Sequence, residues 1–257
     1  MKRKLLYNLL GFILICTICV LVCCVKSKNT IAIIGAMDSE INEIRSNLKH
    51  TRTIQKNDFI ITKGTLGNNN IVLAKSGVGK VAASTTAQFI IDEYNPIYII
   101  NTGIAGSLSP DMKAGSVVIG ENMVQHDFDV TAFGNPRGYI DNGIEPDKPT
   151  VFHSDNKLIE IFKKESAANL ILGTIATGDI FINQKKQKQE IRNEFHADII
   201  DMESAAIAQT AQRNNIPLLV IRTISDSEND SVSEYNNNKK TSAAKAAFVI
   251  ISVLNKI

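Results

Sequence analysis

Cysteine is absent from nearly all of this chain. Beyond residue 25 there is none, and the four that occur before it are Cys16, Cys19, Cys23 and Cys24. This absence excludes a disulfide scaffold, a cysteine-ligated zinc site and a cysteine nucleophile from the rest of the sequence. With 257 residues, the chain is long enough to bury a core without such cross-links.

Histidine is also scarce. The four histidines are His50, His126, His153 and His196. They occur singly, without the paired spacing that a metal site usually shows. The sequence therefore predicts no metal site, and nothing in it implies another cofactor.

An excess of positive charge is absent as well. The chain has 28 Lys and Arg against 26 Asp and Glu, and three of the basic residues, Lys2, Arg3 and Lys4, lie in the first 25 residues, which contain no acid. The remainder is therefore close to neutral. A near-neutral body argues against a protein that coats nucleic acid, and we expect no nucleic-acid partner.

The first 25 residues differ from the rest of the chain. Residues 5–25 carry no charge, and a basic start followed by an apolar run is typical of an export signal. The run is also long enough, at roughly 20 residues, to span a bilayer as an uncleaved anchor. Cys23 and Cys24 stand where a loose lipoprotein box would acylate a cysteine. We therefore predict an export signal or membrane anchor at 1–25 and a short polar linker at 26–29.

A second interpretation of this segment is a buried N-terminal helix. Helices of soluble domains usually carry a polar stripe, and this run has none, so export is favoured. The basic residues are concentrated before the run, which favours a cytoplasmic N-terminus and an outward-facing body. We expect a membrane-associated protein.

Residues 30–257 alternate between strand and helix patterns, which predicts a single α/β domain. Strands are predicted at 30–36, 58–66, 71–76, 97–103, 116–120, 171–176, 198–202 and 216–225. Helices are predicted after the first strand and at 79–94, 154–168, 183–195, 203–214 and 241–256. Long polar loops are predicted at 131–150 and 226–240.

Polar residues gather where four of these strands end. The segments are 37–40, 101–106, 201–203 and 222–226, and three of them bring carboxylates. A single acid there could merely complement a helix dipole. In open α/β sheets, however, ligands bind beyond the carboxyl ends of strands, so four such ends together predict one site.

Seven stretches then make the pattern specific: IAIIGAMDSE, KSGVGKVAA, INTGIAGSL, HDFDVTAFG, TGDIFIN, DMESAAIA and IRTISD. In order and spacing the body resembles the 5′-methylthioadenosine/S-adenosylhomocysteine nucleosidase family of the nucleoside phosphorylase superfamily. The resemblance implies a nucleoside phosphorylase-like fold, with a mixed central β-sheet flanked by helices. It also implies hydrolysis of the N-glycosidic bond of 5′-methylthioadenosine and S-adenosylhomocysteine, which releases adenine.

That reaction needs an acid on the side of the base and a base on the side of the water. The resemblance implies that Glu40 activates the water and that Asp226 protonates adenine at N7, which requires a raised pKa of Asp226. It implies that Glu203 binds the ribose hydroxyls and that Arg222 orients the site, although Arg222 could instead be a structural ion-pair partner. The other substrate contacts that it implies are Met37, Val78, Gly106, Phe181, Ile182 and Met202.

The chain departs from the family pattern at three places. Asp201 stands where the family usually has Glu, and Ile104 stands where some members have a hydroxyl residue. The loop after Asp226 ends in Ser-Glu-Tyr instead of a stretch that contains Phe. The last departure leaves the lid of the 5′ pocket, and with it the preference between the two thio-nucleosides, open.

Two functions other than thio-nucleoside hydrolysis remain open. A nucleoside phosphorylase would need a cationic phosphate cradle, and no arginine occurs at 76–80 or 101–109. An exported adhesin on a nucleosidase fold would need a binding surface of its own. Lys185, Lys186 and Lys188 could form a basic patch for a sulfated polysaccharide, or simply a solvated helix face.

The resemblance also implies a homodimer, in which a partner segment caps each site. The corresponding segment here begins the loop at 131–150 and contains Phe133. An aromatic residue in an otherwise polar loop suits an interface anchor, whereas the alternative is a loop packed on its own domain.

Overall fold

The computed structural model of the chain describes residues 30–141, 147–227 and 232–257. The predicted leader and linker lie outside these ranges. None of the helices in the described ranges combines the length and hydrophobicity that crossing a bilayer requires.

The strands form one mixed sheet, as predicted. In chain order they are β1 (Thr30–Gly35), β2 (Lys49–Lys56), β3 (Phe59–Leu66), β4 (Asn69–Lys75), β5 (Tyr98–Ser107), β6 (Val117–Gln125), β7 (Phe152–His153), β8 (Leu170–Thr177), β9 (Ile199–Asp201) and β10 (Leu218–Asp226). Five of them close into a ring, because β5 pairs with β10, β10 with β6, β6 with β8, β8 with β9, and β9 again with β5. Strands β1, β4, β3 and β2 extend the sheet outward from β5.

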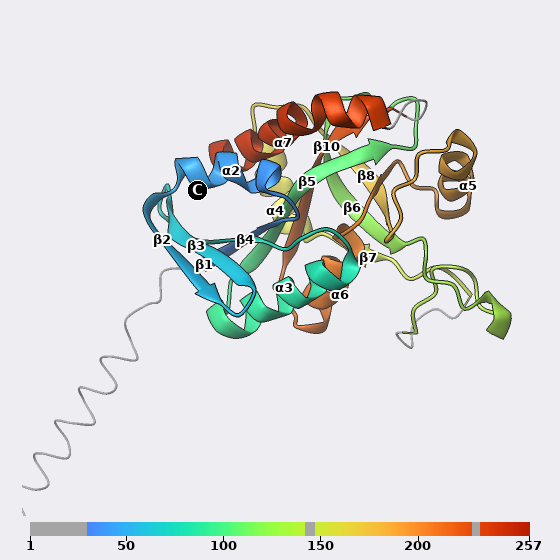
Figure 1. The fold of residues 1–257 in the computed structure, drawn as a ribbon, viewed down its shortest axis with the longest axis horizontal. Coiled ribbons are helices and arrows are strands. Elements are labelled where there is room, and N and C mark those ends of the chain that lie inside the picture. Colours follow the sequence, from blue (N-terminus) through green and yellow to red (C-terminus); the bar gives the residue numbers. More distant parts are fainter. Residues whose placement is uncertain (1–29, 142–146, 228–231) are drawn as a thin grey trace, which may run out of the picture.

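The helices cover both faces of this sheet (Figure 1). They are α2 (Asp38–Asn47), α3 (Lys80–Tyr94), α4 (Asn156–Glu165), α5 (Lys185–Phe195), α6 (Ser204–Arg213) and α7 (Val232–Leu254), and a single 3₁₀ turn, η1, spans Thr131–Phe133. Buried residues of α2, α4 and α7 share one apolar cluster, and those of α3 and α6 share another.

The first strand shows how the sequence produces these two cores. Successive side chains of a strand point to opposite faces of the sheet. Ile31 and Ile33 therefore pack in the cluster with α2 and α7, whereas Ala32 and Ile34 pack in the cluster with α3 and α6. A strand buried on both faces reads as a continuous apolar run, which is why it was recognisable in the sequence.

Strand β5 creates the opening in which the site lies. One edge of β5 pairs with β10 along most of its length. The other edge pairs with β1 as far as Asn101 and with β9 only from Gly106. Between these points the described strands leave a short part of the edge without a partner strand, and the site opens there.

The prediction for the segment before residue 241 was wrong. The region 226–240 was predicted as loop, but α7 begins at Val232. Its buried residues begin only at Ser242, so the first turns lack the apolar periodicity that marks a packed helix.

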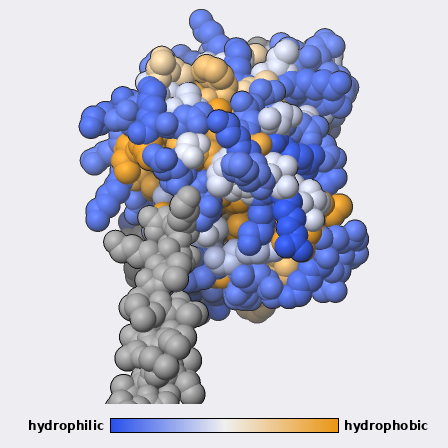
Figure 2. Space-filling view, turned by 90° about the vertical axis from the view of Figure 1, so that its left-hand side faces the viewer, coloured by the Kyte–Doolittle hydropathy of each residue, from blue (hydrophilic) through white to orange (hydrophobic). Residues whose placement is uncertain are grey.

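Strand β2 was not predicted at all. Seven of its eight residues are exposed, so it forms through backbone pairing with β3 and carries no alternating apolar pattern. Figure 2 shows this side of the molecule as mostly hydrophilic, with separate hydrophobic areas between the polar side chains.

Candidate active site

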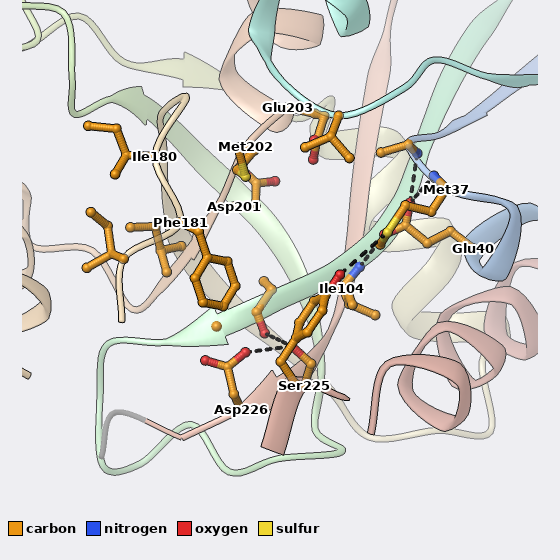
Figure 3. Close-up of a pocket in the computed structure, with 17 residues that line it drawn as sticks. Met37, Glu40, Ile104, Ile180, Phe181, Asp201, Met202, Glu203, Ser225 and Asp226 are labelled. Atoms are coloured by element: carbon orange, nitrogen blue, oxygen red, sulfur yellow. Dashed lines mark hydrogen bonds between the residues drawn. The ribbon is translucent and has the colours of Figure 1, made fainter. Parts of the chain in front are cut away.

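A pocket of about 590 Å³, part of it open to solvent, lies where β1, β5, β9 and β10 meet (Figure 3). Nine of the residues predicted for the site line it: Met37, Glu40, Val78, Gly106, Phe181, Ile182, Met202, Glu203 and Asp226. They come from six separate segments of the chain, which only the fold brings together.

Glu40 lies in the first turn of α2, and its side chain is buried. One carboxylate oxygen, Oε2, accepts hydrogen bonds from the backbone N–H groups of Ala36 (2.7 Å) and Met37 (2.9 Å). The other, Oε1, accepts one from the N–H of Ile104 (3.0 Å), which belongs to the part of β5 that has no partner strand on this edge. Since a carboxylate oxygen can accept two hydrogen bonds, Oε1 retains an acceptor position.

Two opposing effects act on the pKa of Glu40. Burial raises it, whereas the nearby Arg222 guanidinium and the three backbone N–H groups lower it, and the net direction is upward. A carboxylate with a raised pKa is a stronger base than an exposed one. Glu40 is thus both held in place and made more basic.

A glycine makes room for this carboxylate. A Cβ atom at Gly103 would lie 2.7 Å from Oε1 of Glu40 and 2.9 Å from Nη1 of Arg222. Any other residue would force these groups apart, because real Cβ atoms do not approach so closely. Glycine at this position therefore allows the Glu40 carboxylate and the Arg222 guanidinium to pack closely against β5.

Asp226, the last residue of β10, faces the opposite part of the pocket and is also buried. Its Oδ1 atom lies 2.7 Å from the hydroxyl of Ser225, and its Oδ2 atom lies 3.1 Å from the ammonium of Lys188. Burial raises the pKa of Asp226, while Ser225 and Lys188 act in the opposite direction, and the net direction is upward. The raised pKa that an acid at this position requires is therefore present.

Ser225 suits both protonation states of this acid. Its hydroxyl lies 2.7 Å from Asp226 and 3.2 Å from the carbonyl oxygen of Ala105. With only one hydrogen, the hydroxyl donates either to the Asp226 carboxylate or to the carbonyl. When it donates to the carbonyl, its oxygen is free to accept the proton of a neutral Asp226.

Glu203 lies between these two acids in chain order and on the wall formed by the end of β9. Its Oε1 atom accepts a hydrogen bond from the backbone N–H of Gly79 (3.0 Å). Burial, followed by the charge of Asp201, raises the pKa of Glu203 to about 8, although Arg222 acts against this shift. Near neutral pH, Glu203 can therefore both donate to and accept from a ligand hydroxyl.

Arg222, which was predicted to orient the site, is not among the residues that line the pocket. Its guanidinium is buried and bonds to Asp201 (2.9 Å) and to the side-chain oxygen of Asn101 (2.7 Å). It also lies 3.9 Å from Glu203. The structure therefore contains the structural ion pair that was the alternative for Arg222. The positive charge of Arg222 lies close to Asp201 and Glu203 without lining the pocket.

Asp201, the residue that departs from the family pattern, is anchored by neighbours. Besides Arg222, it accepts hydrogen bonds from the hydroxyls of Thr177 and Ser204. Both of its carboxylate oxygens are therefore hydrogen-bonded within the protein.

The apolar part of the pocket includes a residue that the sequence analysis did not assign. Tyr235, in the first turn of α7, contacts the ring of Phe181 edge to face, with 5.5 Å between ring centroids. Its hydroxyl lies 3.5 Å from the sulfur of Met37. The unusual Ser-Glu-Tyr stretch was the available signal, but the region was predicted as loop. Other lining residues that were not predicted are Ala36, Ile104, Ala105, Ile180, Ile200, Asp201 and Ser225.

The predicted basic patch is corrected at one position. Lys185 and Lys186 are exposed on α5, but Lys188 is 1% exposed and forms an ion pair with Asp226. The buried residues of α5 are Lys188, Ile191 and Phe195, which share one helix face at spacings of three and four. That spacing was the signal in the sequence, and it places Lys188 inside the protein.

Phe133 does not line the pocket of its own chain. It is 84% exposed on η1, in a loop that extends from the body of the molecule (Figure 1). The alternative of a loop side chain packed on its own domain therefore does not apply to Phe133.

The charge of the pocket bears on the phosphorylase alternative. In the described part of the chain, no lysine, arginine or histidine is among the residues that line it. A phosphate ion would meet carboxylates here, whereas water is compatible with them. Across the same described ranges, no group of three or more His, Cys, Asp or Glu side chains could hold a metal ion.

Comparisons with known proteins agree with this geometry. Residues 30–255 match the phosphorylase superfamily. A 5′-methylthioadenosine/S-adenosylhomocysteine nucleosidase from an Exiguobacterium species is 34% identical over 233 residues, which cover 88% of this chain and 98% of that protein.

Two solved structures with the same fold have different named activities. The Neisseria meningitidis 5′-methylthioadenosine/S-adenosylhomocysteine nucleosidase, in complex with methylthio-immucillin-A, superposes with a TM-score of 0.82 at 36% identity, covering 89% of this chain and all of that one. The futalosine hydrolase of Helicobacter pylori has a TM-score of 0.82 at 28% identity, covering 89% and 98%.

Proposed function

The chain belongs to the phosphorylase superfamily and, within it, to the 5′-methylthioadenosine/S-adenosylhomocysteine nucleosidases, and from this premise we propose how its residues divide the work of the reaction. The protein is an N-glycosidic hydrolase that acts on thio-nucleosides. What remains to be assigned is which group activates water, which protonates adenine and which holds the sugar.

One observation carries the assignment: two buried carboxyl groups, Glu40 of helix α2 and Asp226 of strand β10, face the same pocket (Figure 3). Glu40 accepts a proton from the attacking water, whose oxygen bonds to C1′ of the ribose. The bond from C1′ to N9 of adenine breaks, and its electron pair stays with the base. Asp226 delivers its proton to N7, so that adenine leaves as a neutral molecule.

The sugar and the base are held by the residues between these acids. Glu203 binds the ribose hydroxyls, since it is buried in the wall of the pocket and can both donate and accept. Phe181 stacks on adenine, with Met202, Ile182 and Gly106 close by. Met37 and Val78 line the 5′-thio end together with Tyr235.

The assay is release of free adenine by the purified full chain from 5′-methylthioadenosine and S-adenosylhomocysteine, with and without phosphate. We expect equal rates in both buffers and the free thio-sugar as the second product. A phosphate requirement would overturn hydrolysis. Futalosine belongs in the same assay, and turnover of futalosine alone would overturn the thio-nucleoside assignment.

For the leader, we propose export with the catalytic domain outside the membrane, held by an uncleaved anchor or by lipid on Cys23 or Cys24. The support is the uncharged run behind a basic start at 1–25. Membrane fractionation of the full chain tests this location, and full-length protein in the cytosolic fraction would contradict it. Replacing both cysteines separates the routes, because only lipid attachment depends on them.

Binding of a sulfated polysaccharide stays a prediction for Lys185 and Lys186 alone. Retention on an immobilised sulfated glycan, compared between the parent chain and the K185A/K186A variant, tests it. Equal retention would end the idea.

A further inference from the structure

A buried lysine stands directly behind the proposed leaving-group acid. Lys188 lies on α5, and its ammonium donates to Oδ2 of Asp226 at 3.1 Å and to the carbonyl oxygen of Ser227 at 2.7 Å. Its side chain is 1% exposed and that of Asp226 4%. Lys188 does not line the pocket, so it can act on a substrate only through Asp226.

Simple packing does not explain a lysine here. The buried face of α5 otherwise carries Ile191 and Phe195, which pack with Ile182 in a small apolar cluster. Removing an ammonium from water costs several kcal/mol, and a well-packed apolar residue in its place is often neutral or stabilising. A buried charge that stability does not require indicates a role in the adjacent site.

We propose that Lys188 is a positioning residue for Asp226: its ammonium fixes the carboxyl group at the base end of the pocket and stabilises the carboxylate that forms when the proton has moved to adenine. This inference rests on the proposed role of Asp226 as the acid.

The charge balance of the step explains why a cation is useful. Before the step Asp226 is neutral, and afterwards it is a buried anion while adenine has left as a neutral base. A buried anion without a partner is costly, and the Lys188 ammonium offsets that cost at the moment the charge appears. A charge-assisted hydrogen bond is roughly twice as strong as a neutral one, so the interaction is stronger after proton transfer than before it.

The other groups around Asp226 define what removal of Lys188 should do. Ser225 on β10 favours the carboxylate, whereas Glu234 on α7 favours the neutral acid, as does burial. Tyr235, also on α7, faces the same pocket. Lys188 is the cation that pairs with Asp226 in the described ranges, so its loss leaves the raising influences opposed only by Ser225.

The test compares Lys188→Met with the parent enzyme in full pH profiles of kcat and KM. Without the ammonium, the pKa of Asp226 rises further, so the alkaline limb of the kcat profile should move to higher pH. At the same time the plateau should fall by about tenfold, because a weaker acid protonates adenine less effectively. KM should change by less than about twofold, since Lys188 does not contact the substrate.

Matched variants separate this role from a structural one. Glu190→Gln on the same helix removes an exposed charge that pairs with Lys186, and it should leave the profile unchanged. Lys188→Gln keeps a hydrogen-bond donor without the charge, so it should show the same upward shift even if the methionine variant folds poorly. Lys188→Arg retains the charge and should keep the parent limb.

Two results for Lys188→Gln would overturn the proposal. One is a lower kcat plateau whose alkaline limb stays at the pH of the parent, and the other is a pH profile of kcat equal to that of the parent. A different result would show that Asp226 is not the acid that protonates adenine. If Asp226→Asn retained near-parent turnover, Asp226 would not be the acid, whatever the Lys188 variants show.

Discussion

At the scale of single residues, the three acids of the pocket differ in what holds them. Three backbone N–H groups fix Glu40, one N–H and a distant guanidinium accompany Glu203, and a hydroxyl and an ammonium flank Asp226. Fixed backbone donors hold a base in one orientation. A hydroxyl that can reverse its hydrogen bond suits an acid that must lose its proton.

The acid and the base should each be essential to turnover. Glu40→Gln and Asp226→Asn keep the size of the side chain but remove proton transfer, so each should lower kcat by about 100-fold or more. Steady-state adenine release measures this, with Glu43→Gln, an exposed change on the same helix as Glu40, as the control. Near-parent turnover in either variant would contradict its assigned role.

Glu203 should make stability depend on pH. Its pKa is about 8 in the folded protein against 4.5 as the ordinary value, so the folded state binds more protons between these values. Stability from this group is therefore fully present below about pH 4.5 and is lost as the pH rises through about 8, by roughly 1.4 kcal/mol for each unit of pKa difference.

Thermal or urea unfolding at several pH values checks this expectation. The difference in unfolding free energy between the parent and Glu203→Gln should decrease as the pH rises from 4.5 to 8. A pH-independent difference would show that Glu203 is not protonated in the folded protein. Above about pH 8, where Glu203 is ionised, the same variant should bind ribose-containing ligands more weakly, because charge-assisted hydrogen bonds to the hydroxyls are replaced by neutral ones.

At the scale of elements, the site depends on where strands and helices begin and end. Strand β5 carries Ile104 past the end of β1, so that a backbone N–H is left for Glu40. Helix α7 begins early enough to place Tyr235 over the pocket mouth. A shorter β5 would remove the hydrogen bond to Glu40, and a later start of α7 would remove Tyr235 from the pocket.

Tyr235 should act through its ring more than through its hydroxyl. Tyr235→Phe removes the contact with the sulfur of Met37 but keeps the edge-to-face contact with Phe181, so KM should stay within about threefold of the parent. Tyr235→Ala loses the aromatic pair, worth roughly 0.5–1.5 kcal/mol, together with its buried area.

We therefore expect Tyr235→Ala to raise KM for 5′-methylthioadenosine by about tenfold. Steady-state kinetics on both thio-nucleosides measure the effect. An alanine variant with a parent-like KM would mean that α7 does not close this end of the pocket.

At the scale of the whole molecule, several large apolar side chains are exposed, and three of them belong to the pocket. Val78, Ile180 and Phe181 line the pocket and remain about half exposed, while Val81 in α3 and Phe133 are exposed by 77% and 84%. Large exposed apolar groups near a site are typical of a surface that binds another protein. A second copy of the chain is the partner we propose.

The protein should accordingly be a dimer in solution. Light scattering should give twice the 28.1 kDa of one chain, and Phe133→Asp should lower that mass and the activity together. Phe248→Asp, at an exposed phenylalanine of α7 away from the pocket, is the matched control and should stay dimeric. A monomeric and fully active parent would contradict the prediction.

The sequence by itself determined the α/β class and the order of most elements, and its resemblance to a known family indicated nine of the residues that line the pocket. The class and the element order are local features, because β1 is buried on both faces and therefore reads as an apolar run, and polar residues such as Glu40 and Asp226 stand near the ends of strands. The exposed strand β2 and the polar start of α7 carried no such pattern, so they were missed.

Only the tertiary structure decided the partners of the charged residues. Arg222 of β10 bonds to Asp201 of β9, a strand that does not pair with β10. Lys188 enters the interior because α5 turns its apolar face inward, and it meets Asp226, 38 residues later in the chain. A periodic pattern indicates which face of a helix is buried. Which side chain contacts that face depends on how distant segments of the chain pack.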